Sequence, residues 1–261
     1  RILLPPFIIL VILLGVRYRF FWRARLRPNP PKVMAHRGLK THSPENTISS
    51  YKEAVDHGFD AIEIDLIQTK DGILMCSHNF DLERETSGQG WIHQKNEKEL
   101  NSIKTGVYSH GNNTQSMPTF FEVLSTIPEK VFLNIEIKTR KLFDMSAAKS
   151  LGKIIRNKTI NHPFMISSFN PIVVAYFRIF HSNVSVGFIL QDIEWLWVTH
   201  WIHPDFFHPR GDLVDDEIIE MSQNHKLPLI LWTINTQPAM TWCKKNNIKS
   251  IITDNPMGIH V

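Results

Sequence analysis

Short apolar runs alternate with amphipathic stretches over most of the chain. From Lys32 onward the apolar runs predict strands at residues 33–36, 61–66, 131–137, 164–168, 184–190, 206–209, 229–234 and 250–253. Stretches of helical periodicity between them predict helices at residues 46–57, 119–127, 146–157, 171–180, 215–225 and 238–246. Eight strand–helix units favour an α/β fold of the (β/α)8 TIM-barrel type over an open, doubly wound sheet. No glycine-rich dinucleotide fingerprint follows the first strand, which also counts against a Rossmann fold.

One unit departs from this pattern after the second predicted strand. Residues 72–78, "GILMCSH", predict an extra strand that pairs with the second strand through the turn "TKDG". Residues from about 79 to 118 carry Gly, Ser, Asn and Thr without clear periodicity. We therefore expect a small insertion here, packed over one rim of the barrel.

The first 27 residues differ in character from the rest of the chain. Residues 2–16 are wholly apolar, and the arginine-rich stretch "RYRFFWRARLR" follows them. A membrane-spanning helix needs about 20 residues, a length that interfacial aromatic and arginine side chains would complete here. We expect residues 1–27 to form a membrane anchor that contacts membrane lipids, rather than a signal peptide or an interfacial or buried helix. The TIM-barrel catalytic domain is then expected at residues 28–261, and the positive-inside rule places it in the cytoplasm.

The charge balance excludes a nucleic-acid-binding surface. The chain has 29 basic and 25 acidic residues, but seven of the basic residues fall within the first 32 positions. The remainder has 22 basic against 25 acidic residues, so the basicity is local. The two cysteines, Cys76 and Cys243, are far apart, which excludes a disulfide framework. The sequence does not predict an oligomeric state.

Three carboxylates interrupt the second and third predicted strands. Successive side chains of a strand point to opposite faces, so Glu63 and Asp65 share one face and Ile64 points to the other. Glu136 lies in the same way on the third strand. With the apolar face packed on the outer helices, the carboxylates face the barrel lumen, where they would repel one another unless a cation lies between them. Glu63, Asp65 and Glu136 are therefore candidate ligands of one divalent cation, Ca²⁺ or Mg²⁺, which prefer oxygen donors.

Other polar residues fall at the carboxyl ends of predicted strands, where TIM barrels carry their reactive groups. They are His36, Arg37, His78, Lys138 and Trp232. Each has an alternative interpretation when taken alone. A histidine can be structural, an arginine can brace the barrel through a salt bridge, and a tryptophan can pack in the core. We expect Asn46 to cap the first helix of the barrel, and Asp254 to fix the loop after the last strand.

Several motifs occur in the order found in one enzyme family. They are "MAHRG", "PENT", "EIDLIQTKDG", "SHN-D", "NIEIK", "WTIN" and "TDNP", spread over residues 32–258. With these motifs the chain resembles the glycerophosphodiester phosphodiesterases, here of a short-insertion, membrane-anchored type. The resemblance to sphingomyelinase D-like and phosphatidylinositol phospholipase C barrels is looser, because those lack the whole set.

The resemblance implies metal-dependent hydrolysis of glycerophosphodiesters to glycerol 3-phosphate and an alcohol. Contact of the chain with a membrane would also put lysophospholipids within reach of the site as further substrates. By position, Glu63, Asp65 and Glu136 match metal ligands, His36 and His78 a general acid/base pair, Arg37 and Lys138 phosphate-binding cations, and Trp232 a substrate-wall residue. The alternatives are a phospholipase D- or C-type enzyme on the same barrel, giving a lysophosphatidic or cyclic phosphate product, and a binding protein without activity. Whether water or the substrate's 2-hydroxyl is the nucleophile stays open, as does the division of acid and base roles.

Overall fold

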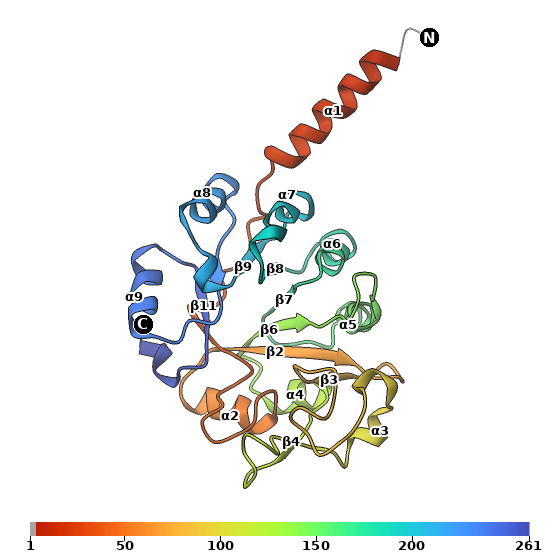
Figure 1. Ribbon diagram of the computed structural model, residues 1–261, viewed down its shortest axis with the longest axis vertical. Helices are drawn as coiled ribbons and strands as arrows, with labels where there is room; N and C mark the ends of the chain where they lie inside the picture. The colour runs from red at the N-terminus through yellow and green to blue at the C-terminus, as the bar shows by residue number, and fades with distance from the viewer. Residues whose placement is uncertain (1–3, 261) are drawn as a thin grey trace.

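The computed structural model describes residues 4–260, and its centre is a nearly closed parallel barrel (Figure 1). Eight parallel strands follow one another in the spatial order β10-β11-β1-β2-β6-β7-β8-β9. Isolated parallel bridges, Phe207 to Leu229 and Arg210 to Trp232, join β9 to the segment around β10. The predicted TIM barrel is therefore confirmed. The barrel strands are β1 Val33–Ala35, β2 Ala61–Gln68, β6 Phe132–Ile137, β7 Phe164–Ser168, β8 Val186–Leu190, β9 Phe206–Pro209, β10 Ile230–Leu231 and β11 Ser250–Thr253.

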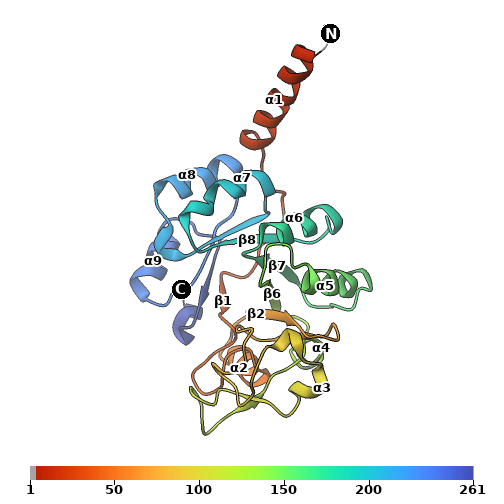
Figure 2. The same cartoon turned by 45° about the vertical axis from the view of Figure 1, so that its right-hand side comes forward.

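Helices surround this barrel on the outside (Figures 1 and 2). They are α2 Ile48–Asp56, α4 Phe120–Thr126, α5 Ser146–Arg156, α6 Pro171–Phe180, α7 Thr199–Ile202, α8 Asp216–His225 and α9 Gln237–Lys245. Side-chain caps satisfy the first turns of α2, α4, α6, α8 and α9. Thr47 and Thr119 form capping boxes at α2 and α4, and Asn170 accepts from the backbone N–H of Ile172 at the start of α6.

The two faces of the strands separate into two apolar layers. The outward residues of β2 and β6, such as Ile64 and Ile135, join the main core together with Tyr51 of α2 and Leu151 of α5. The inward residues near the amino ends of the strands form a second, smaller cluster that closes the bottom of the lumen. Its buried members are Met34, Ala61, Met165, Phe206, Ile230 and Ile252. The polar residues described below lie above this apolar floor, as the period-two pattern predicts.

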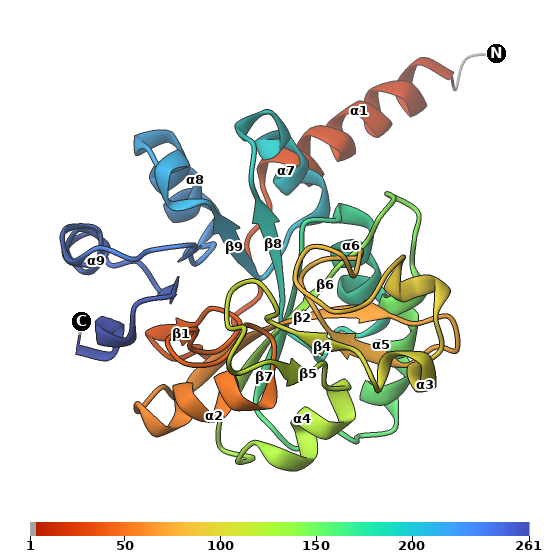
Figure 3. The ribbon, with the colours of Figure 1, turned by 60° about the horizontal axis from the view of Figure 1, so that its bottom comes forward.

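The chain between β2 and α4 forms irregular structure beside the barrel. β3 (Leu74–Cys76) pairs antiparallel with β2, and the rest includes η1 (Ile92–Gln94), α3 (Glu97–Leu100) and the two-stranded ladder of β4 (Lys104–Thr105) and β5 (Gln115–Ser116). A buried cluster of its own, containing Met75, Leu82, Ile92 and Leu100, packs these pieces on Ile67 of β2. Figures 1 and 3 place α3 and β4 on the same side of the molecule as α4.

The first described helix, α1 (Leu4–Phe20), projects away from the barrel (Figures 1 and 2). It has 17 residues, whereas a span of the hydrocarbon region needs about 20, and two arginines occupy its last turn. Within residues 4–260, no helix combines the length and the apolar character that crossing a membrane requires. The prediction of a membrane-anchored chain with a cytoplasmic catalytic domain is therefore overturned.

The residues after α1 lie against the amino-terminal end of the barrel. The Arg25 guanidinium makes two hydrogen bonds with the fully buried carboxylate of Asp205, Nε to Oδ1 at 2.6 Å and Nη2 to Oδ2 at 2.5 Å. The Trp22 indole stacks between the imidazoles of His203 and His225, with centroid distances of 4.6 and 4.3 Å. The segment that follows α1 is thus packed on the loops that precede β9 and β10.

Candidate active site

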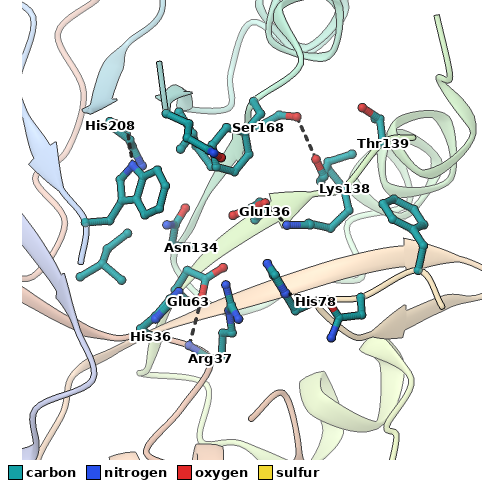
Figure 4. Close-up of a pocket in the computed structure, with 18 of the residues that line it drawn as sticks. His36, Arg37, Glu63, His78, Asn134, Glu136, Lys138, Thr139, Ser168 and His208 are labelled. Carbon is teal, nitrogen blue, oxygen red and sulfur yellow. Dashed lines mark hydrogen bonds and ion pairs between the residues drawn. The ribbon is translucent and has the colours of Figure 1, made fainter. Parts of the chain in front are cut away.

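A cavity of about 460 Å³ opens at the carboxyl ends of the barrel strands (Figure 4). Side chains from β2, β6, β9 and the loops after β1 and β3 line it. The cavity brings together seven of the eight predicted site residues: His36, Arg37, Glu63, His78, Glu136, Lys138 and Trp232. The eighth, Asp65, is fully buried and contacts Arg37 and Lys138, which both line the cavity.

The acidic residues form a compact buried cluster. Glu63, Asp65 and Glu136 each place one carboxylate oxygen within 4.8 Å of the others. The register explains this proximity, because Asp65 of β2 lies opposite Glu136 of β6. Within the described residues, Oε1 of Glu63 is buried without a hydrogen-bond partner. Three oxygen donors at this spacing fit a hard divalent cation, and Oε1 of Glu63 has no ion pair among the described residues either.

Burial and mutual repulsion set the protonation of this cluster. Burial raises the pKa of Glu63 well above its usual range, and the charges of Asp65 and Glu136 raise it further. Burial likewise raises the pKa of Glu136, although Lys138 opposes this. Burial would raise the pKa of Asp65 too, but Lys138 and Arg37 outweigh it and hold that pKa below its usual value. The cluster therefore contains more carboxyl groups than its neighbouring cations, Lys138 and Arg37, can neutralise.

Two cations flank the acidic cluster. Lys138 Nζ lies 3.0 Å from Oε1 of Glu136 and 3.5 Å from Oδ1 of Asp65. Arg37 Nε lies 3.1 Å from Oδ2 of Asp65, while its Nη1 donates to both carboxylate oxygens of Glu45 at 3.0 and 3.1 Å. Arg37 therefore braces the barrel mouth through ion pairs and also faces the cavity.

Each predicted catalytic histidine has a hydrogen-bond partner at Nδ1. Nδ1 of His36 lies 2.8 Å from Oδ1 of Asp254, and Nδ1 of His78 lies 3.2 Å from Oδ1 of Asn79. These acceptors favour the tautomers with the proton on Nδ1, which leaves Nε2 free to accept a proton. Burial lowers the pKa of His36 despite Asp254, and burial followed by the charge of Lys138 lowers the pKa of His78 to about 4. Both imidazoles are thus neutral at pH 7.

The model of the "Glycerophosphoryl diester phosphodiesterase family" matches residues 36–257, and these residues include every part of the cavity. The chain belongs to this family. It is accordingly an enzyme, a glycerophosphodiester phosphodiesterase of the phosphoric diester hydrolases.

The family assignment agrees with curated relatives and with solved structures. The glycerophosphodiester phosphodiesterase of Caldanaerobacter subterraneus subsp. tengcongensis is 29% identical over 233 residues, covering 86% of this chain and 94% of that protein. The enzyme of the same name from Bacillus altitudinis is 26% identical over 243 residues, covering 86% and 95%. An Oleispira antarctica phosphodiesterase, solved with the product sn-glycerol-3-phosphate, superposes with a TM-score of 0.78 at 23% identity, covering 88% of this chain and 95% of that one.

Sequence reasoning missed what Asn46 does in this phosphodiesterase. Asn46 has a positive φ of 55° and does not cap α2, because Thr47 does so. Its Oδ1 accepts from the backbone N–H of Asp65 at 3.1 Å and from the Tyr51 hydroxyl at 2.9 Å, and its Nδ2 donates to Oδ2 of Asp65 at 2.9 Å. Asn46, which we expected to cap a helix, therefore holds Asp65 of the acidic cluster in position.

The role expected for Asp254 was likewise too narrow. Its carboxylate binds His36, accepts from Lys40 at 2.6 Å and from Asn235 at 3.0 Å, and so links the last strand to the first. The predicted barrel could have suggested this contact. Its last strand, β11, pairs with its first, β1, so their carboxyl ends lie side by side.

Trp232 follows β10 directly and lines the cavity. Its indole Nε1 donates to the backbone oxygen of His208 at 2.8 Å, and the Phe169 ring packs edge-on against it at 5.5 Å. This packing fixes the indole as part of the cavity wall. His208 itself lines the cavity and was not among the residues predicted.

Proposed function

We propose that this phosphodiesterase hydrolyses glycerophosphodiesters to sn-glycerol 3-phosphate and an alcohol, in a reaction that depends on one divalent cation, Ca²⁺ or Mg²⁺. The observation that carries the proposal is the content of a single cavity. Two neutral imidazoles, two buried cations and a buried acidic cluster face it from the loops and strands around its mouth. Each of these groups can contribute to the cleavage of a phosphodiester.

Glu63, Asp65 and Glu136 are the proposed ligands of the cation. The raised pKa of Glu63 supports this role, because a neighbouring positive charge would stabilise its ionised form. When bound there, the cation supplies positive charge against the non-bridging oxygens of the phosphate.

The side chains of the enzyme then perform binding and proton transfer. Arg37 and Lys138 are the proposed partners of the phosphate oxygens, where their charges would offset the negative charge that accumulates during substitution. One of His36 and His78 accepts the proton of the nucleophile, which is water or the 2-hydroxyl of the substrate. The other delivers a proton to the departing alcohol oxygen, so it must take up that proton when the anionic phosphate binds, because a neighbouring negative charge raises the pKa of an imidazole. Trp232 forms the wall that holds the substrate between them.

We also propose lysophospholipids as substrates of the same site. A second cavity of about 450 Å³ adjoins the first and shares Thr139, Phe169, Ile189 and Gln191 with it. Leu142, Phe188 and Trp195 give this neighbouring cavity an apolar wall, which suits an acyl chain.

The direct test is an assay of the purified full chain with glycerophosphocholine, with products resolved by ³¹P NMR. We expect sn-glycerol 3-phosphate, loss of activity with EDTA, and recovery with excess Ca²⁺ or Mg²⁺. Replacing His36 or His78 with Ala should lower kcat by about 10²–10⁴-fold, because each moves a proton in the reaction. His57→Ala is the matched control, since that exposed imidazole follows the last turn of α2, does not line the cavity, and lies against the backbone oxygen of Glu53.

Two results would contradict the proposal. Activity that survives EDTA would exclude the cation. A cyclic phosphate that accumulates as the final product, with glycerophosphocholine or with lysophosphatidylcholine, would instead indicate a phospholipase C-type lyase. Lysophosphatidic acid formed from lysophosphatidylcholine would support the broader substrate range.

A further inference from the structure

The lumen below the acidic cluster contains polar side chains that nothing in the described protein satisfies. His208 of β9 and Asn134 of β6 line the cavity and are 0% and 1% exposed. Among residues 4–260, neither ring nitrogen of His208 and neither amide atom of Asn134 has a hydrogen-bond partner. Figure 4 shows both side chains around the cavity that holds Glu63 and Glu136.

Such groups are costly to leave unpaired. A buried donor or acceptor without a partner costs about 1–3 kcal/mol, so native structures satisfy nearly all of them. The residues beneath, including Met165 and Phe206, are apolar and offer no partner. A molecule that enters through the cavity could supply the hydrogen bonds that no partner among residues 4–260 makes to these four atoms.

The chemistry of the two side chains selects an uncharged hydroxyl. Burial lowers the pKa of His208 to about 3, so the imidazole is neutral at working pH and offers one N–H donor and one acceptor. The Asn134 amide also offers both a donor and an acceptor. A hydroxyl group, which donates and accepts at once, complements either side chain, whereas an anion would leave their acceptor atoms unpaired.

The protein positions the His208 ring closely. Gly187 of β8 lies against the Nε2 edge of the ring, and a Cβ atom at that position would be 2.3 Å from Nε2 of His208. Asn134 is opposite Glu63 in the register of β6 and β2, which puts the amide next to the acidic cluster. The polar side chains thus continue from the proposed phosphate position into the lumen.

We infer that His208 and Asn134 bind the glycerol hydroxyls of the substrate, with the terminal 1-hydroxyl on His208. This inference rests on the proposed function and specifies how the substrate enters. The constant glycerol end points down into the barrel, and the variable alcohol points out toward the rim, where Phe80, Asp81 and Trp91 line the cavity.

The test compares two substrates in the full chain with its cation. The first is glycerophosphocholine, and the second is 2-hydroxypropyl phosphocholine, which retains the 2-hydroxyl and lacks only the terminal one. His208→Leu should lower kcat/KM for glycerophosphocholine by about 10–100-fold, since one partner of a buried hydrogen bond is removed. It should leave kcat/KM for the analogue within about 3-fold, a change too small to count as a lost hydrogen bond. His208→Gln, which retains a donor and an acceptor, should restore part of the preference for glycerophosphocholine over the analogue.

Gly187→Ala provides an independent variant if His208→Leu fails to fold. The added methyl group must displace the imidazole without removing it, so the same selective loss for glycerophosphocholine is expected. Equal losses for both substrates, or no loss for either, would overturn the inference and leave the proposed function intact. A wild-type enzyme that cleaves neither substrate would overturn both.

Discussion

At the scale of single residues, burial decides which side chains of the cavity carry charge. His36 and His78 are neutral at pH 7, and each has Nδ1 against an oxygen acceptor. Lys138 and Arg37 remain charged, because the carboxylates around them raise their pKa values more than burial lowers them. Proton acceptors and fixed positive charges therefore coexist in one cavity at neutral pH.

His208 gives a pH-dependent contribution to stability that can be measured. Its pKa is about 3 in the folded protein and about 6.5 when unfolded, so between these values only the unfolded chain binds the proton. Stability from this residue is therefore complete above pH 6.5 and is lost as pH falls toward 3. Denaturant unfolding of the wild type and of His208→Gln at pH 7 and pH 5 should show a relative loss of about 2 kcal/mol in the wild type. A difference that does not change with pH would show that the imidazole is not buried as described.

The sequence reveals a residue's place in a strand better than its partners across the barrel. Glu63, Asp65 and Glu136 could be assigned to the lumen because period-two alternation is a local property. The contact of His36 with Asp254 and the burial of His208 depend on how distant strands close around the lumen. Only the closed barrel brings those side chains together, so no single segment of the sequence predicts these contacts.

At the scale of elements, the turn before α2 supports the acidic cluster. Asn46→Gly removes the three hydrogen bonds of the side chain without straining a backbone that has φ of 55°. We expect metal affinity to fall by about 10–100-fold, as for other residues that orient ligands, and thermal stability to fall as well. Calorimetric titration with Ca²⁺ or Mg²⁺ measures the affinity.

Thr47→Ala is the matched control for that turn. It removes the capping box of α2, which should cost about 1 kcal/mol of stability, but it touches no member of the acidic cluster. Metal affinities that fall equally in both variants would show that Asn46 acts only through the stability of the helix.

Strand positions were easier to predict than their ends. All eight predicted barrel strands have counterparts, yet the strand predicted at residues 229–234 is regular only at Ile230–Leu231. Leu229 and Trp232 make isolated bridges to β9, because this is where the barrel is least regularly closed. The short helix α7 was missed, since four residues give too little periodicity to detect.

At the scale of the whole molecule, the segment after α1 is part of the packed structure. Asp205 is fully buried, and Arg25 and Arg178 both donate to its carboxylate. We expect Arg25→Met to destabilise the full chain by about 3 kcal/mol at most, because a buried carboxylate would lose one of its two hydrogen-bonded arginines. Arg23→Met is the control, as that side chain is exposed. Equal effects of the two variants in thermal unfolding would argue against a structural role for this segment.

The expected boundary between residues 27 and 28 remains a prediction. Composition alone did not reveal the contacts that the residues before this boundary make. A basic, aromatic stretch resembles a segment that lies at a membrane interface when the residues that contact it are unknown. The partners of Trp22 and Arg25 are about 180–200 positions away along the chain, for example His203 and Asp205. Nothing local distinguishes an arginine that binds a buried aspartate from one that faces solvent.

The position of Trp22 at the amino ends of the barrel strands has a practical consequence for attaching the protein to a surface. Trp22 is packed at the amino ends of the barrel strands, whereas the cavity proposed to bind substrate opens at the opposite, carboxyl ends. A bead or a fluorophore coupled ahead of α1 would leave the mouth unobstructed, so an immobilised enzyme should turn over as fast as the free one.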